Sequence, residues 1–199
     1  MPSSSPKSPI KAIIFDFGGV VVPGIFLEYV KKLSTNDPKY ILFKESSQKW
    51  DLGELSVDQF YLTLSQLMGI PHYSKHSNYY ANAAFNEDII KIIKTLKKSY
   101  KVALFTNNFS YHLYQYLNRR KLNNLFHKLI ISSEHKMVKP NPAFYHKMLS
   151  LININSNEAI FIDDSKENVD AGNALGITSF LFTDTEKLKK DLKSKGVIV

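Results

Sequence analysis

The sequence predicts an α/β protein: a doubly wound parallel sheet with a small helical cap inserted after the first strand. Two observations favour this fold class. From about residue 86 onward, short apolar runs alternate with segments of helical periodicity. Such alternation indicates parallel strands whose connecting helices cover both faces of the sheet. Between the first apolar run and residue 84 the periodicity is helical and no core strand is evident, which predicts the inserted cap.

The first strand is expected over Ala12–Phe15, an apolar run that ends in Asp16 and then in Gly18 and Gly19. Glycines allow a tight backbone path and a close approach of main-chain N–H groups to a ligand. Ligands of open α/β sheets bind at the carboxyl ends of strands. Asp16 is therefore a candidate metal ligand or nucleophile, with a simple turn-capping role as the alternative.

Residues 22–84 carry the expected cap. Ser56 is a good helix N-cap, and Gly69 ends the amphipathic run that follows it. His72 and His76 are four residues apart but have no third ligand nearby, so we expect surface histidines there rather than a metal pair. The helices expected in this segment are Ile25–Leu33, Tyr40–Trp50 and Phe60–Met68.

The rest of the chain supplies the remaining strands and helices of the sheet domain. The expected strands are Val102–Phe105, Leu129–Ile131, Ala159–Ile162 and Ser179–Phe182. The expected helices are Glu87–Ser99, Tyr111–Asn118, Pro142–Leu151, Asn168–Leu175 and Lys187–Lys195.

Composition narrows the class of protein further. The chain has 199 residues, is 44% hydrophobic and contains no cysteine, so disulfides, thiolate metal sites and cysteine nucleophiles are excluded. No apolar window approaches the ~18 residues that span a bilayer. Residues 1–9 are polar and rich in proline and serine, and we expect a disordered tail rather than a signal peptide. A cytoplasmic protein fits these features.

The net charge of +8 raises nucleic acid as a partner. Nearly all of the positive charge is lysine, however, and Arg119 and Arg120 are the only arginines. Arginine is the better residue for bidentate recognition of phosphates and bases, and no nucleic-acid-binding motif is present. We therefore expect solvated surface lysines and no nucleic acid partner. A positive field that attracts anionic substrates also fits this charge.

Reactive side chains follow several of the expected strands: Asp16 the first, Thr106 the second, Asp163 and Asp164 the fourth, with Lys139 in the loop after the third. Parallel strands bring their carboxyl ends to one edge, so these groups are expected to converge. Three adjacent carboxylates repel one another unless a cation lies between them, and oxygen ligands suit Mg²⁺. A hydroxyl, an ammonium and glycine N–H groups beside that cation suit a phosphate dianion, which Asp16 could attack.

Each of these residues also has a simpler interpretation. Thr106 could cap the following helix, Lys139 could be a surface lysine, and the 163–164 pair could form a turn and a helix cap. Together, in this order and at strand ends, they favour phosphoryl transfer.

This pattern resembles the haloacid dehalogenase-like (HAD) hydrolase superfamily, and the likeness runs from about residue 11 to 185. The matching motifs are Asp16-Phe17-Gly18-Gly19-Val20, Leu104-Phe105-Thr106-Asn107, Lys139-Pro140-Asn141-Pro142-Ala143-Phe144-Tyr145 and Phe161-Ile162-Asp163-Asp164-Ser165. Gly53-Glu54-Leu55-Ser56 with Phe60 resembles a cap signature of the subgroup that holds bacterial glucose-1-phosphate phosphatase and the phosphatase domain of soluble epoxide hydrolase. The resemblance implies a Rossmann-like core of residues 10–21 and 85–199 and a cap of residues 22–84.

The resemblance also implies a role for each motif residue. For the metal, Asp16 would be both nucleophile and Mg²⁺ ligand, and the Gly18 carbonyl would be a second ligand. Asp164 would bind the metal directly, and Asp163 through water or from the outer shell. For the phosphate, the implied contacts are Thr106, the amides of Asn107 and Gly19, and Lys139 bridging phosphate and Asp16.

One departure from the family pattern matters. Most phosphatases of the family carry at position 18 an Asp that protonates the leaving alcohol, and this chain has Gly18. Loss of a general acid typically costs ~10²–10⁴ in rate. Three interpretations follow. The protein could be a Mg²⁺-dependent phosphatase of a small phosphorylated metabolite such as a sugar phosphate, or a phosphate-binding or protein-interaction module without turnover. It could also be a dehalogenase, but that reaction needs no Mg²⁺, so the intact acidic pair argues against it. A smaller departure is His135-Lys136, where relatives often have an apolar residue and Gly.

Overall fold

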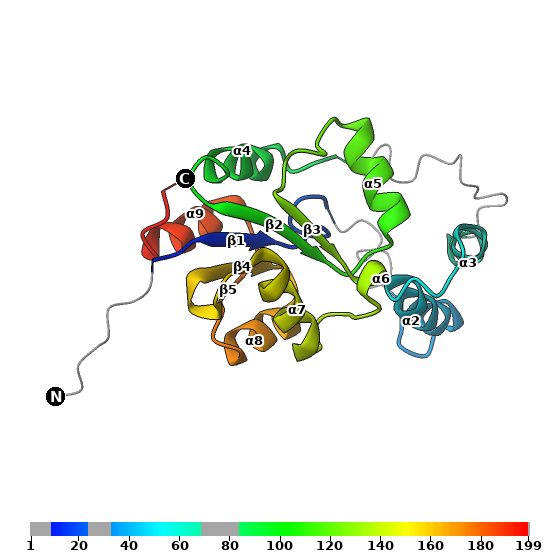
Figure 1. Ribbon diagram of the computed structural model, residues 1–199. Helices are drawn as coiled ribbons and strands as arrows, with labels where there is room; N and C mark the ends of the chain where they lie inside the picture. Colours follow the sequence, from blue (N-terminus) through cyan, green and yellow to red (C-terminus); the bar gives the residue numbers. More distant parts are fainter. Residues whose placement is uncertain (1–8, 24–32, 69–83, 199) are drawn as a thin grey trace.

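A computed structural model of the protein describes residues 9–23, 33–68 and 84–198. Three of the expectations lie essentially outside these residues: the N-terminal tail, the helix at 25–33 and the pair of His72 and His76. The remaining segments form a sheet flanked by helices, with a further helix pair beyond one edge of the sheet (Figure 1).

The sheet has five parallel strands in the order β3-β2-β1-β4-β5, which confirms the predicted α/β fold. The chain first winds outward from β1 to β3, and then returns to place β4 on the other side of β1. This reversal creates a switch point between β1 and β4, where ligands of such sheets bind. The strands are β1 Ala12–Phe15, β2 Lys101–Thr106, β3 Lys128–Ile131, β4 Ala159–Asp163 and β5 Thr178–Leu181.

Helices cover both faces of the sheet, and every residue of the two central strands β1 and β4 is buried. On one face Ile13 and Phe15 join a core with side chains of α4, α5 and α9, and on the other Ile14 joins a core with α7 and α8. Strand alternation explains this division, since successive side chains point to opposite faces. The helices are α4 Glu87–Leu96, α5 Ser110–Arg119, α7 Pro142–Ile152, α8 Lys166–Ala174 and α9 Thr185–Ser194.

The helix pair consists of α2 Pro38–Asp51 and α3 Val57–Met68, which pack on each other. The strand arrows of Figure 1 point toward this pair, so it lies beyond the carboxyl edge of the sheet. The start of α3 confirms Ser56 as the N-cap: its Oγ accepts from the Gln59 amide at 3.2 Å, and the Gln59 side chain accepts from the Ser56 amide at 2.8 Å. This reciprocal pair is a capping box.

Several element bounds differ from the predicted ones. The predicted helix 87–99 ends at Leu96, and beyond it the Lys98 and Ser99 amides bond three residues back, to the Thr95 and Leu96 carbonyls, instead of four. A short helix, α6 Ser132–His135, and a 3-10 turn, η1 Ser156–Glu158, occupy segments for which no helix was predicted. Both are single turns, too short to give a periodic pattern.

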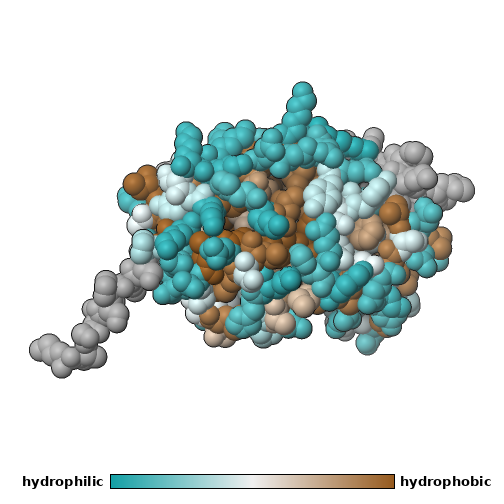
Figure 2. All heavy atoms as spheres, in the orientation of Figure 1, coloured by the Kyte–Doolittle hydropathy of each residue, from teal (hydrophilic) through white to brown (hydrophobic). Residues whose placement is uncertain are grey.

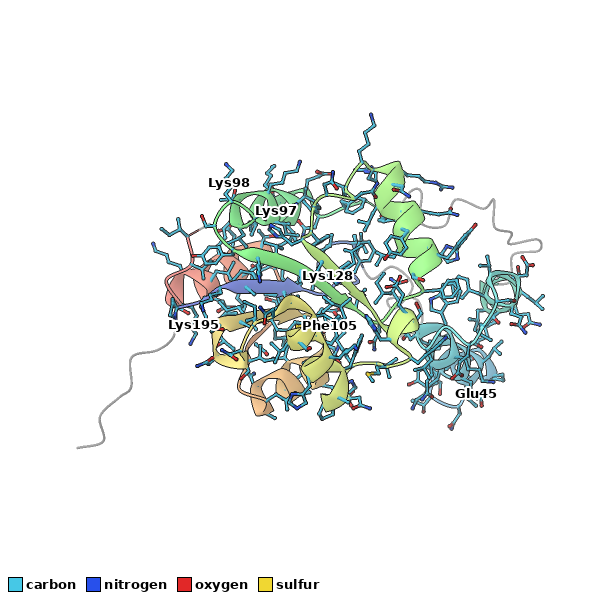
Figure 3. All side chains as sticks on the ribbon, in the orientation of Figure 1. Glu45, Lys97, Lys98, Phe105, Lys128 and Lys195 are labelled. Carbon is cyan, nitrogen blue, oxygen red and sulfur yellow. The ribbon has the colours of Figure 1, made fainter. Side chains whose placement is uncertain are left out.

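Among the described residues, no helix is both long enough and apolar enough to cross a membrane. Figure 2 shows a face covered largely by hydrophilic side chains, with hydrophobic residues gathered toward its centre. Lys97, Lys98 and Lys195 project from the end of the molecule that lies away from Glu45 on α2 (Figure 3). These lysines are therefore remote from the carboxyl edge of the sheet.

Candidate active site

Three carboxylates meet at the switch point of the sheet. Asp16 follows β1, Asp163 ends β4, and Asp164 comes next in the chain. One oxygen of each lies within 4.8 Å of the others. The sequence placed these residues at one edge, and the structure brings them within the reach of a single ion.

Lys139 projects into this cluster from the loop before α7. Its Nζ lies 2.6 Å from Asp163 Oδ2 and 3.0 Å from Asp16 Oδ1, and it donates to the Phe105 carbonyl of β2 at 3.0 Å. Its side chain is only 1% exposed. A buried ammonium is tolerated only when it is paired, and here two carboxylates and a carbonyl pair with it.

Asn107 fixes the main chain of Lys139. Its side-chain amide donates to the Lys139 carbonyl at 3.0 Å, and its Oδ1 accepts from the Lys139 amide at 2.8 Å. Thr106, immediately before it, is buried at the end of β2. The sequence assigned Asn107 through its backbone amide alone, and this positioning by the side chain was missed.

Asp163 and Asp164 have different surroundings. Asp163 is fully buried and accepts from Lys139, from the Ser165 amide at 2.8 Å, and from Asn168 Nδ2 at 3.0 and 3.1 Å. Asp164 is partly exposed. Asp163 therefore has its oxygens engaged by protein donors, whereas Asp164 lies against Gly19 in the loop after β1. Asn168 was not recognised from the sequence, and its place one turn into the helix after the acidic pair is the signal that could have found it.

The two glycines after Asp16 differ in what they accommodate. Gly19 has a φ of +73°, and a Cβ added there would lie 2.0 Å from Asp164 Oδ2. Only glycine therefore lets the loop pass against the Asp164 carboxylate. A Cβ added to Gly18 meets nothing within 4 Å, so the structure leaves open space where most family phosphatases carry their acid.

The electrostatics of the cluster favour an added cation. Burial, reinforced by Asp163, raises the pKa of Asp16 to about 7 against the opposing effect of Lys139. Burial lowers the pKa of Lys139, but Asp16 and Asp163 together raise it further, so the ammonium stays charged. Asp16 Oδ1 has no well-aligned hydrogen bond among the described residues. A buried, under-paired oxygen beside two further carboxylates fits a hard divalent cation such as Mg²⁺.

The α2–α3 pair is joined to this edge by polar contacts from α6. Lys136 Nζ donates to the carbonyls of Leu52 at 2.8 Å and Gly53 at 2.9 Å, just after α2. Lys136 has a φ of 54°, a conformation that glycine adopts at no steric cost. The chain thus has a lysine at a position that suits glycine, and the lysine side chain binds the end of α2.

Aromatic rings make the second contact between the helix pair and the sheet domain. The Trp50 ring stacks on Phe60 with centroids 3.4 Å apart, and lies 4.3 Å from Phe109 and 5.1 Å from His112 at the start of α5. Trp50 is buried near the end of α2. This packing holds the last turn of α2 against the segment that follows Thr106.

The chain belongs to the haloacid dehalogenase-like hydrolases, whose family model matches residues 13–182. It is 29% identical to a D-ribitol-5-phosphate phosphatase of Bacteroides thetaiotaomicron over 187 residues, covering 86% of this chain and 91% of that protein. It is also 27% identical to a sesquiterpene phosphatase of Aspergillus oryzae over 179 residues, covering 88% and 91% of the two chains.

The fold is similar to that of a HAD family enzyme from Bacteroides thetaiotaomicron, crystallised in complex with magnesium and inorganic phosphate. The TM-score is 0.70 at 22% identity, and the match covers 90% of this chain and 98% of that one. The resemblance proposed from the four motifs is therefore confirmed at the level of the family and the fold.

Proposed function

We propose that this protein is a Mg²⁺-dependent phosphatase that hydrolyses a small phosphorylated metabolite through an aspartyl phosphate on Asp16. The observation that carries the proposal is the cluster of Asp16, Asp163 and Asp164 with Lys139 paired to two of them. Family membership and the phosphatase names of both sequence relatives support it.

In this proposal Asp16, Asp164 and the Gly18 carbonyl hold the metal, and Asp163 acts from the outer shell. The engagement of Asp163 by Lys139, Ser165 and Asn168 supports that division. A bound Mg²⁺ would neutralise charge on the phosphate and lower the pKa of Asp16, so that the carboxylate is ionised and nucleophilic.

The chain's own groups then carry out the transfer. Asp16 attacks phosphorus in line with the leaving oxygen, and the phosphate is held by Thr106, the amides of Asn107 and Gly19, and Lys139. Lys139 offsets the charge on the transferred oxygens, and Asn107 keeps it in place through the two hydrogen bonds to its main chain. Water then releases phosphate from Asp16.

We also propose the domain division suggested by the sequence: a core of residues 10–21 and 85–199 and a cap of residues 22–84. The place of α2 and α3 beyond the carboxyl edge supports it. A cap at that edge contacts the part of the substrate beyond the phosphate. The relatives act on a polyol phosphate and on sesquiterpene phosphates by name, so we expect a small organic phosphate and test sugar and polyol phosphates first.

The test is phosphate release from p-nitrophenyl phosphate and from a panel of sugar, polyol and isoprenoid phosphates, with Mg²⁺ and then with EDTA. We expect release that EDTA abolishes. Asp16→Asn is expected to reduce turnover by ~10⁴-fold or more, as loss of a covalent nucleophile does, without lowering the thermal unfolding midpoint. No EDTA-sensitive release from any substrate would leave the second candidate, a phosphate-binding module, which Gly18 favours because it supplies no proton.

A further inference from the structure

The proposed phosphatase mechanism lacks a proton donor at the expected place. An alkoxide is a poor leaving group, so a group near the leaving oxygen must protonate it. Gly18 has no side chain, and Asp16 and Asp164 are assigned to the metal. Asp163 is buried beneath Lys139 and Asn168. The donor for this reaction must therefore come from another element.

Asp51, the last residue of α2, lies beside the phosphate-binding loop. Ser132 Oγ is 2.5 Å from the Asp51 carbonyl, and it accepts from the Asn108 amide at 2.9 Å. A hydroxyl has a single hydrogen to donate and can accept as well, so one serine joins the end of α2 to the residue two positions after Thr106. The position of Asp51 is thus set from the core side of the site.

The charges of the carboxylate cluster also affect the pKa of the Asp51 side chain. Burial raises the pKa of Asp51 to about 7, with Lys139 lowering it and Asp16 raising it. The charges of Lys139 and Asp16 thus act on the pKa of this carboxyl, although α2 is far from them in sequence. In the described part of the chain, no ion pair involves Asp51.

Two other titratable groups near the end of α2, Lys136 and His112, are engaged elsewhere. Lys136 binds the carbonyls of Leu52 and Gly53. The His112 ring packs on Trp50, and burial lowers its pKa to about 4, so it is neutral near pH 7. Of the two described carboxyl groups at this end of α2, Glu54 is exposed, and Asp51 is the one whose pKa is raised to about 7.

We propose that Asp51 is the general acid and base of the reaction, supplied from α2 in place of a residue at position 18. This inference rests on the proposed phosphatase function. The open space at Gly18 fits it, because a Cβ there meets nothing within 4 Å, so the β1 loop itself brings no acid to that place.

The proton balance is complete in two steps. In the first, the bond from phosphorus to an Asp16 oxygen forms, the bond to the leaving oxygen breaks, and that oxygen takes the Asp51 proton and leaves as the alcohol. In the second, water attacks the phosphorus of the aspartyl phosphate while the Asp51 carboxylate takes its proton. The bond to Asp16 breaks, and inorganic phosphate and both starting carboxyl groups are recovered.

The test compares an alkyl phosphate with p-nitrophenyl phosphate, whose leaving group needs no proton, in wild type and Asp51→Asn. The ratio kcat/KM covers the steps through leaving-group departure. We expect Asp51→Asn to lower kcat/KM by ~10²-fold or more for the alkyl phosphate and by less than about tenfold for the nitrophenyl ester. Asp58→Asn, an exposed acid of α3, is the matched control and is expected to leave both values unchanged.

Two further measurements sharpen the result. The first measurement uses the wild type alone. Its kcat/KM for the alkyl phosphate is expected to fall above about pH 7, where Asp51 loses its proton, whereas kcat/KM for the nitrophenyl ester is expected not to fall. Gly18→Asp placed in the Asp51→Asn background is expected to raise kcat/KM for the alkyl phosphate at least tenfold above that of Asp51→Asn alone, because it returns an acid to the usual position.

The outcomes separate the two proposals. Equal losses on both substrates would reduce Asp51 to a structural residue, and no loss on either would assign the proton to water. In both cases the phosphatase function would stand. A wild-type protein without EDTA-sensitive turnover would overturn both proposals.

Discussion

The carboxyl edge of the sheet and the end of α2 are held by different kinds of contact. At the edge, buried charges fix one another, as Lys139 does with Asp16 and Asp163. At the end of α2, stacked rings of Trp50 and Phe60 and two backbone carbonyls bound by Lys136 make the attachment. Buried charges are costly to unpair, whereas exposed hydrogen bonds to carbonyls are not. We therefore expect loss of the buried Lys139 cation to affect folding and chemistry together, and loss of the Lys136 contacts after α2 to affect stability little.

The largest effect is expected from Lys139→Met. It leaves Asp163 and Asp16 buried without their cation, and breaking a buried pair from one side costs about 3–5 kcal/mol. Urea unfolding measures this loss, and phosphatase activity is expected to vanish with it. Lys101→Met removes a side chain whose ammonium donates to the Ile152 carbonyl and serves as the control, with a loss under about 1 kcal/mol. Equal losses for the two lysines would show that the edge is not held by its charges.

Asn107→Ala is expected to have the next largest effect. It deletes both hydrogen bonds to the Lys139 main chain, so kcat is expected to fall by ~10–10²-fold through misplacement of the ammonium. The free energy of unfolding is expected to drop by about 1–3 kcal/mol. Asn155→Ala removes a capping asparagine before η1 and is expected to cost stability alone. Full activity in Asn107→Ala would mean that Lys139 does not need this support.

The pH dependence of stability tests Asp51 independently of activity. Burial raises its pKa in the folded protein to about 7, above the ordinary value of 3.8. As the pH rises, the unfolded chain loses this proton near pH 4 and the folded protein only near pH 7. The free energy of unfolding therefore falls between about pH 4 and about pH 7. Asp51→Asn has no such loss, so its thermal midpoint is expected to exceed that of the wild type at pH 8 and to approach it as the pH falls toward 4. A difference independent of pH would contradict the buried state of this carboxyl.

The smallest effect is expected from Lys136→Gly. The substitution removes the contacts to Leu52 and Gly53 but relieves a φ of 54°. These effects oppose each other, so the free energy of unfolding is expected to change by less than about 1 kcal/mol. A rise in KM without a fall in stability, measured on the best substrate of the panel, would show that this lysine acts on the α2–α3 pair alone. A loss comparable to that of Lys139→Met would erase the contrast between the two regions.

The sheet and its catalytic edge could be predicted because their signals are local. Four-residue apolar runs such as Ala12–Phe15 form strands only in a buried sheet, and an acid such as Asp16 directly after a run marks its carboxyl end. Parallel pairing then brings Asp163 to the same edge whatever the loops between them do.

Other parts of the site depended on contacts that no local pattern records. Asn107 reads as a strand-end residue in the sequence, yet its side chain binds the main chain of Lys139, 32 residues away. Neither Ser132 nor Lys136 was predicted to contact the helices before residue 84, yet both bind the end of α2 more than 80 positions earlier in the chain.

The sequence by itself thus determined the fold, the family and the acidic cluster, because burial and strand order leave those side chains a single edge to occupy. Only the tertiary structure decided what surrounds the cluster. The partial burial of Asp51 depends on how α2 packs against α6 and the start of α5, and its pKa depends on charges that reach it through space rather than along the chain.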